Sequence, residues 1–168
     1  MYSHILIAVD GSDEATRAAR HGLSVADLFD ATVDVLHVVE RRALRLARGD
    51  EADRLRERGE TALAAVEAAA ADRGRSVDST QREGRPAAEI AAFADDLDAD
   101  LVVVGRQGAT GLGKRLLGGV TEGLLGRSSV PVLVVPEAAD APAYDRVLLP
   151  TDGSDRAEAA IPHAAAVA

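Results

Sequence analysis

Apolar residues in this chain gather into short runs of strand length, separated by longer stretches with helical periodicity. The runs predict strands at about 4–9, 32–39, 76–82, 100–105 and 130–135. A helix should follow the first run, with Ser12 as a favourable N-cap residue. The regular alternation of strands and helices is typical of an α/β fold, in which helices cover both faces of a parallel sheet.

The other helices are predicted from the same periodicity. A long helix should run over about 51–71, another should begin at Pro86, and a short one should span about 119–128. The run at 100–105 is continuously apolar, as expected for a parallel strand covered on both faces. The arginine-rich stretch 40–49 lacks such a pattern, and we interpret it as a solvated connection.

A glycine-rich segment, 105–119, follows the fourth apolar run and precedes the short helix. Glycines let the backbone approach a ligand closely, and a helix N-terminus offers unpaired N–H groups to anions. Within the segment, Gly105, Gly108 and Gly118 show a Gly-x2-Gly-x9-Gly spacing. The segment therefore predicts a phosphate-binding loop, and a flexible connection that only turns the chain is the alternative.

This spacing, together with the segments at 5–12, 36–39 and 129–135, resembles the nucleotide-binding branch of the universal stress protein family. The resemblance covers about residues 2–136. It implies a Rossmann-like, five-stranded parallel sheet in the order 3-2-1-4-5. In that order the loops after the first and fourth strands meet at a topological switch point, where such folds bind ligands. A dinucleotide dehydrogenase is not supported, because the turn at 10–14 is acidic and poor in glycine.

The resemblance also implies the ligand, an adenine nucleotide (ATP, ADP or AMP) with Mg2+. The residues that match the nucleotide-binding positions of the family are Ala8, Val9, Asp10, Val38, Gly105, Arg106, Gly108, Gly118, Gly119 and Val120. The first three would contact the base and the ribose, the Val38 backbone would read the adenine edge, and the others would surround the phosphates.

Three charged side chains have a second interpretation. Asp10 would reach Mg2+ through water, or it would only cap the first helix. Lys114 and Arg115 would contact phosphate charge, or they would only solvate the loop. One position departs from the family pattern, since Gly119 stands where a Ser or Thr is usual. The missing hydroxyl should weaken nucleotide binding about tenfold or more.

Composition limits the class of protein. The net charge of −9 and the scarcity of aromatic residues, two Tyr, two Phe and no Trp, argue against a nucleic-acid surface. The chain has no Cys, no visible signal peptide and no apolar run of membrane-spanning length, so we expect a cytoplasmic protein. Its acidic, arginine-biased composition resembles that of proteins from salt-loving microbes, although a genome rich in G and C would favour the same residues.

The end of the chain repeats its beginning. Residues 144–168 align without a gap on residues 2–26 and share the sequence Asp-Gly-Ser-Asp with them. We therefore predict a domain over 1–136, a linker over 137–143, and the start of a second, truncated module at 144–168. The second module should dock at the periphery or stay mobile, because the first already has its own central strand.

The function indicated is that of an ATP- or AMP-binding regulatory protein of the stress response. The alternatives are a nucleotide-independent dimeric interaction protein on the same fold, and a weak nucleotide hydrolase. No residue is assigned a catalytic role, and His21 and His37 are interpreted as structural because neither has a metal-ligand partner at useful spacing. A homodimer is expected through the apolar edge strand at 130–135.

Overall fold

The structure is a computed structural model that describes residues 1–107, 117–136, 144 and 146–167. Three residues of the expected site, Gly108, Lys114 and Arg115, lie outside the described residues. The expected linker at 137–143 lies outside them as well.

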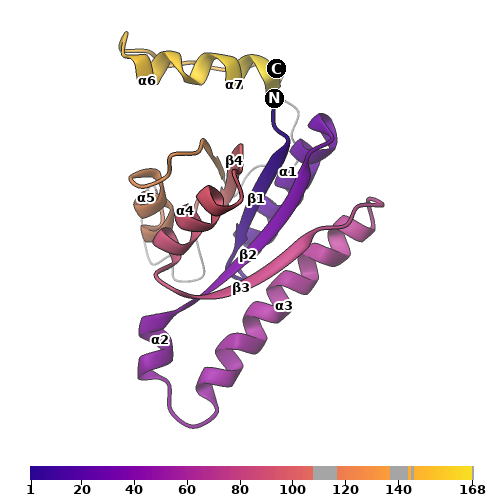
Figure 1. Ribbon diagram of the computed structural model, residues 1–168, viewed down its shortest axis with the longest axis vertical. Coiled ribbons are helices and arrows are strands. Elements are labelled where there is room, and N and C mark those ends of the chain that lie inside the picture. Colours follow the sequence, from indigo (N-terminus) through magenta and orange to yellow (C-terminus); the bar gives the residue numbers. More distant parts are fainter. Residues whose placement is uncertain (108–116, 137–143, 145, 168) are drawn as a thin grey trace.

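The described residues form one five-stranded parallel sheet in the order β3-β2-β1-β4-β5 (Figure 1). This confirms the fold class and strand order expected from the sequence. In chain order the elements are β1 (His4–Val9), α1 (Asp13–Phe29), β2 (Thr32–Glu40), α2 (Arg41–Leu46), α3 (Glu51–Ala71), β3 (Asp78–Gly84), α4 (Pro86–Asp96), β4 (Leu101–Gly105), α5 (Gly119–Leu125), β5 (Val132–Val135), α6 (Asp155–Glu158) and α7 (Ala160–Val167).

Side chains of β1 alternate between two cores, one on each face of the sheet. Ile5 and Ile7 pack in a core with residues of α1 and α3. Leu6 packs on the opposite face with residues of α4 and with Leu124 of α5. All three β1 side chains are fully buried, which explains why this strand reads as a continuous apolar run.

The helix boundaries follow local sequence signals. The Ser12 side-chain oxygen accepts a hydrogen bond from the Ala15 backbone N–H (3.1 Å), so it caps α1 as predicted. Asp30 ends α1 in the left-handed conformation, with φ of 52°. The long helix spans Glu51–Ala71 and α4 begins at Pro86, both as expected.

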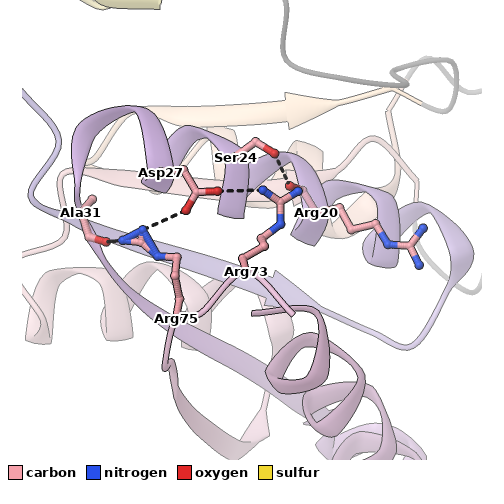
Figure 2. Close-up of polar contacts among 6 residues, drawn as sticks. All are labelled: Arg20, Ser24, Asp27, Ala31, Arg73 and Arg75. Atoms are coloured by element: carbon pink, nitrogen blue, oxygen red, sulfur yellow. Dashed lines mark hydrogen bonds and ion pairs between the residues drawn. The ribbon is translucent and has the colours of Figure 1, made fainter. Parts of the chain in front are cut away.

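A charged contact joins the end of α1 to the turn between α3 and β3 (Figure 2). Asp27 accepts hydrogen bonds from Arg73 (2.7 Å) and Arg75 (3.1 Å). Arg75 also donates to the Ala31 carbonyl oxygen (2.5 Å). The two guanidinium groups offset the repulsion between the Asp27 carboxylate and the negative end of the α1 dipole. They also fix the turn that leads into the edge strand.

Two expectations about secondary structure were wrong. The stretch interpreted as a connection contains α2, although its arginines are exposed as expected, and Arg41 donates to the Glu83 carbonyl oxygen (3.2 Å). The third strand lies two residues later than predicted, because its pairing with β2 fixes the register at Asp34 with Asp78.

No helix in the described part of the chain is long and apolar enough to cross a membrane.

The C-terminal segment takes only part of its expected structure. Residues 146–150 form no strand, and Leu148 is 89% exposed, although these residues align with the first strand in the repeat. The centre of the sheet is already occupied by β1, so this run has no strand to pair with among the described residues. Figure 1 shows α6 and α7 end to end beside the N-terminus, set apart from the sheet. That the segment begins a second module remains a prediction.

Candidate functional site

The carboxyl ends of three neighbouring strands meet at one edge of the sheet. Ile7 of β1 pairs with Val103 of β4, and Val9 of β1 pairs with His37 of β2. A cavity of about 1020 Å³ lies at this edge. Its lining comes from the ends of β1, β2 and β4, the start of α1, the segment that begins α5, and one face of α3. This is the place at which open parallel sheets bind ligands.

Hydrogen bonds hold the two ends of the glycine-rich segment together. The Gly118 backbone N–H donates to the Arg106 carbonyl oxygen (2.9 Å), and the Arg106 N–H donates to Val135 (2.9 Å). The Thr121 hydroxyl donates to the Gly105 carbonyl oxygen (3.0 Å). The start of α5 is therefore held beside the end of β4.

Gly105 leaves little room for a side chain where β4 passes the first turn of α1. A Cβ atom at this position would lie 3.3 Å from backbone atoms of Glu14 and from the carbonyl oxygen of Gln107. Because those neighbours are backbone, they have little freedom to move aside. Gly119 differs, since a Cβ atom there would meet nothing within 4 Å. That position can accept a side chain without a clash.

Most of the expected site residues come together at this cavity. Those that line it are Ala8, Val9, Asp10, Val38, Gly105, Gly118, Gly119 and Val120. Arg106 is described but is not among the lining residues, and its Nε is buried with no hydrogen-bond partner among the described residues. Asp10 is exposed, and one of its carboxylate oxygens accepts from the Ser12 backbone N–H (3.0 Å).

His37 forms part of the cavity wall and has a fixed tautomer. Its Nδ1 donates to the Val9 carbonyl oxygen (2.9 Å), since a carbonyl can only accept. Burial lowers the pKa of His37 below its usual value, while the bond to Val9 and the charge of Asp10 oppose that shift. The imidazole is therefore neutral at physiological pH, and it ties the ends of two adjacent strands together.

One face of α3 also lines the cavity, which the sequence analysis did not anticipate. Leu55, Arg58, Ala62 and Ala65 contribute to it at helical spacing. The helix lies close to the sheet because Gly59 has no side chain, and a Cβ atom there would lie 2.4 Å from the His37 ring. The helical spacing of the apolar residues on this face is visible in the sequence. Only the tertiary structure shows that Arg58 brings a positive charge to the cavity wall.

The described residues hold no group of three or more His, Cys, Asp or Glu side chains arranged to bind a metal ion directly. Asp10 is an exposed carboxylate on the cavity wall. A metal ion that arrives with a phosphate ligand and keeps most of its water needs only one or two such groups. The lining thus fits a ligand-borne ion.

Comparison with known proteins identifies the relationship that this geometry suggests. The model of the universal stress protein family matches residues 1–136. The chain belongs to the universal stress protein family. It is 39% identical over 140 residues to the universal stress protein MJ0531 of Methanocaldococcus jannaschii, covering 80% of this chain and 82% of that protein.

Two solved structures of the universal stress protein family are also similar to this chain. One, a universal stress protein in complex with cAMP, has a TM-score of 0.59 and 28% identity, with 80% of this chain and 97% of that chain covered. The other is a universal stress protein from Archaeoglobus fulgidus, with a TM-score of 0.77 and 25% identity. That match covers 98% of this chain but only 62% of the longer one.

Proposed function

We propose that this protein binds an adenine nucleotide, ATP or AMP, and acts as a nucleotide-dependent regulator in a stress response. The observation that carries the proposal is the cavity at the carboxyl edge of β1 and β4, lined by eight residues expected from sequence alone. The complex of a related universal stress protein with cAMP supports the choice of an adenine nucleotide.

The lining suggests how the nucleotide would lie. Ala8 and Val9, which line the cavity, would contact the base and ribose, and the Val38 backbone would read the adenine edge. Gly118 and Gly119 lie where β4 and α5 are joined, and they would accommodate the phosphates. Arg58, on the opposite helix, would supply a positive charge that the sequence analysis had sought in Lys114 and Arg115.

Mg2+ would enter with the nucleotide. The ion would neutralise part of the phosphate charge, and Asp10 would contact it through water. The carboxylate keeps one oxygen on the Ser12 N–H, so its orientation is set before a ligand arrives. We assign no catalytic residue, and any hydrolysis of ATP would be slow.

A second candidate function is nucleotide-independent pairing of two chains through β5. Val132, Leu133 and Val134 are only half-buried on this edge strand, which leaves apolar side chains and one ladder of backbone groups available. Gly119, in place of the usual hydroxyl residue, favours this alternative because it weakens the phosphate site. Light scattering of the full chain at high salt tests it, since a monomer mass at micromolar concentration would contradict pairing.

Three substitutions at Gly119 test the nucleotide site without disturbing the fold, because the position faces open space. Gly119→Ser should tighten binding of ATP with Mg2+ about tenfold by restoring a hydroxyl near the phosphates. Gly119→Asp should weaken binding by at least the same factor, because a carboxylate repels phosphate. Gly119→Ala is the matched control and should leave the affinity unchanged, as measured by calorimetry.

The series distinguishes the two functions. If all three variants bind ATP as the parent does, the phosphates do not lie at Gly119 and the proposed orientation is wrong. If neither the parent nor Gly119→Ser binds any adenine nucleotide, the nucleotide-independent function replaces the first.

A further inference from the structure

Two contacts between tyrosine and histidine side chains hold the C-terminal segment against the first domain. The Tyr2 hydroxyl is hydrogen-bonded to Nδ1 of His163 (2.8 Å), and their rings are stacked. His21 is hydrogen-bonded through Nε2 to the hydroxyl of Tyr144, and their rings meet edge to face. In both pairs the ring centroids are 5.7 Å apart. Tyr2 and His21 are buried.

The internal repeat relates these contacts to each other. In the gap-free alignment of 144–168 on 2–26, Tyr144 corresponds to Tyr2 and His163 corresponds to His21. The tyrosine of each copy therefore contacts the histidine of the other. A reciprocal arrangement of this kind defines an isologous interface, in which the same surface patch on each partner meets its own copy about a two-fold axis. The two pairs differ in ring angle and in the nitrogen used, so the symmetry is approximate.

We propose that the surface formed by Tyr2 and His21 is a two-fold docking site for a repeat-related copy of itself, and that residues 144–168 of the same chain occupy it. The partner that fits this surface has a tyrosine ahead of an Asp-Gly-Ser-Asp turn and a histidine in the helical segment after that turn. Both features occur in the repeat with the same spacing.

The docking site is separate from the cavity. Tyr2 lies before β1, at the amino end of the strand, whereas the cavity lies at the carboxyl ends. Neither Tyr2 nor His21 lines the cavity. Docking of the repeat therefore leaves the proposed nucleotide site open, and the two surfaces can be tested independently.

Cross-linking of paired cysteines in the full chain tests the proposal, because the chain contains no cysteine of its own. One variant combines Tyr2→Cys with His163→Cys, and the second combines His21→Cys with Tyr144→Cys. A third variant, Leu46→Cys with His163→Cys, provides the background, since Leu46 is an exposed residue of α2, far from α7 in Figure 1. Each is treated with a short bismaleimide and analysed by mass and by denaturing gel.

Both matched pairs should form cross-links within one chain, well above the background variant. Cross-links in only one matched pair would overturn the two-fold relationship. Cross-links that join two chains in both pairs would overturn the assignment of the occupant to the same chain. Background yield in both pairs would overturn the docking site itself.

Ring-retaining variants provide a second measurement that leaves the first domain intact, because its two cores contain none of the described residues of the segment. Tyr144→Phe and His163→Phe each remove one hydrogen bond and keep an aromatic ring. Hydrogen exchange of the α7 amides should accelerate about three- to tenfold in each variant, because an isolated helix this short is marginal in water. Leu148→Ala, at an exposed position, should leave it unchanged. Unchanged exchange in both ring variants would contradict the proposal.

Discussion

The chain contains nearly the same sequence at both ends, yet the two copies fold to different extents. At the first copy, Asp10 accepts from the Ser12 N–H (3.0 Å) and Ser12 caps α1 through the Ala15 N–H (3.1 Å). At the second, Asp152 accepts from Ser154 (2.9 Å), and Ser154 accepts from the Ala157 N–H (3.3 Å). The glycines between them have φ of 83° and 78°. The turn and the cap form in both places because they depend only on neighbouring residues.

The strand forms only in the first copy, and the helix is continuous only there. In the first copy, β1 is hydrogen-bonded to β2 and β4, and its side chains fill two cores. In the second, the corresponding residues 146–150 form no strand. The helix is also interrupted, because Pro162 has no N–H to donate to the Glu158 carbonyl oxygen four residues earlier. A helix cap needs only residues close in the sequence, whereas a strand needs adjacent strands to pair with.

The largest difference in stability between the two copies should appear when the corresponding leucine is truncated in each. Leu6 is fully buried, whereas the corresponding Leu148 is 89% exposed. Leu6→Ala should lower the free energy of unfolding by about 2–5 kcal/mol because it leaves a cavity in the core. Leu148→Ala should change it by less than about 0.5 kcal/mol. Denaturant unfolding of both variants measures the difference, and equal losses would mean that the second copy is packed as tightly as the first.

The two aspartates at the start of the repeated turn should differ in ligand binding. Asp10→Asn keeps an oxygen for the Ser12 N–H but removes the charge, so affinity for ATP with Mg2+ should fall about tenfold. Affinity for ATP without Mg2+ should not fall, since a repulsive charge has been removed. Asp152→Asn should leave both affinities unchanged within about twofold. An equal loss of affinity in both variants would show that the second copy contributes to the site.

A smaller effect is expected at the two helix caps. Ser12→Ala should lower the free energy of unfolding by about 1 kcal/mol, because α1 is part of the folded core. Ser154→Ala removes an equivalent bond but should leave global unfolding unchanged and only speed hydrogen exchange in α6. Global destabilisation by Ser154→Ala would contradict the view that this segment is peripheral.

The smallest expected effect is the pH dependence of stability. Burial lowers the pKa of both His37 and His21, so the folded state binds these protons more weakly than the unfolded chain. The free energy of unfolding should therefore be unaffected by these groups above about pH 6.5, and it should fall as the pH drops below that value. His37→Asn keeps a side-chain N–H for the Val9 carbonyl oxygen but cannot titrate. It should therefore flatten this decline, as measured by unfolding at a series of pH values, and an unchanged profile would exclude His37 as a cause.

The same distinction between local and long-range structure explains how far the sequence predicts the molecule. Apolar runs and caps were sufficient to predict the alternation of strands and helices and the start of α1, because each signal lies within a few residues. The strand order was implied by the resemblance to the universal stress protein family. That resemblance, carried in part by the spacing of Gly105, Gly108 and Gly118, also implied which strand ends would meet at a ligand site. Arg58 was missed, since its place on the cavity wall depends on Gly59 fitting against His37, which is a contact between distant parts of the chain.

The central claim is that the cavity at the carboxyl edge of the sheet binds an adenine nucleotide. Equilibrium dialysis of labelled ATP and GTP against the full chain with Mg2+, at low and at high salt, tests it most directly. We expect ATP to bind with a dissociation constant in the micromolar to tens-of-micromolar range, and GTP to bind more weakly because the Val38 backbone would read the adenine edge. Retention of neither nucleotide at both salt concentrations, or equal retention of both, would contradict the claim.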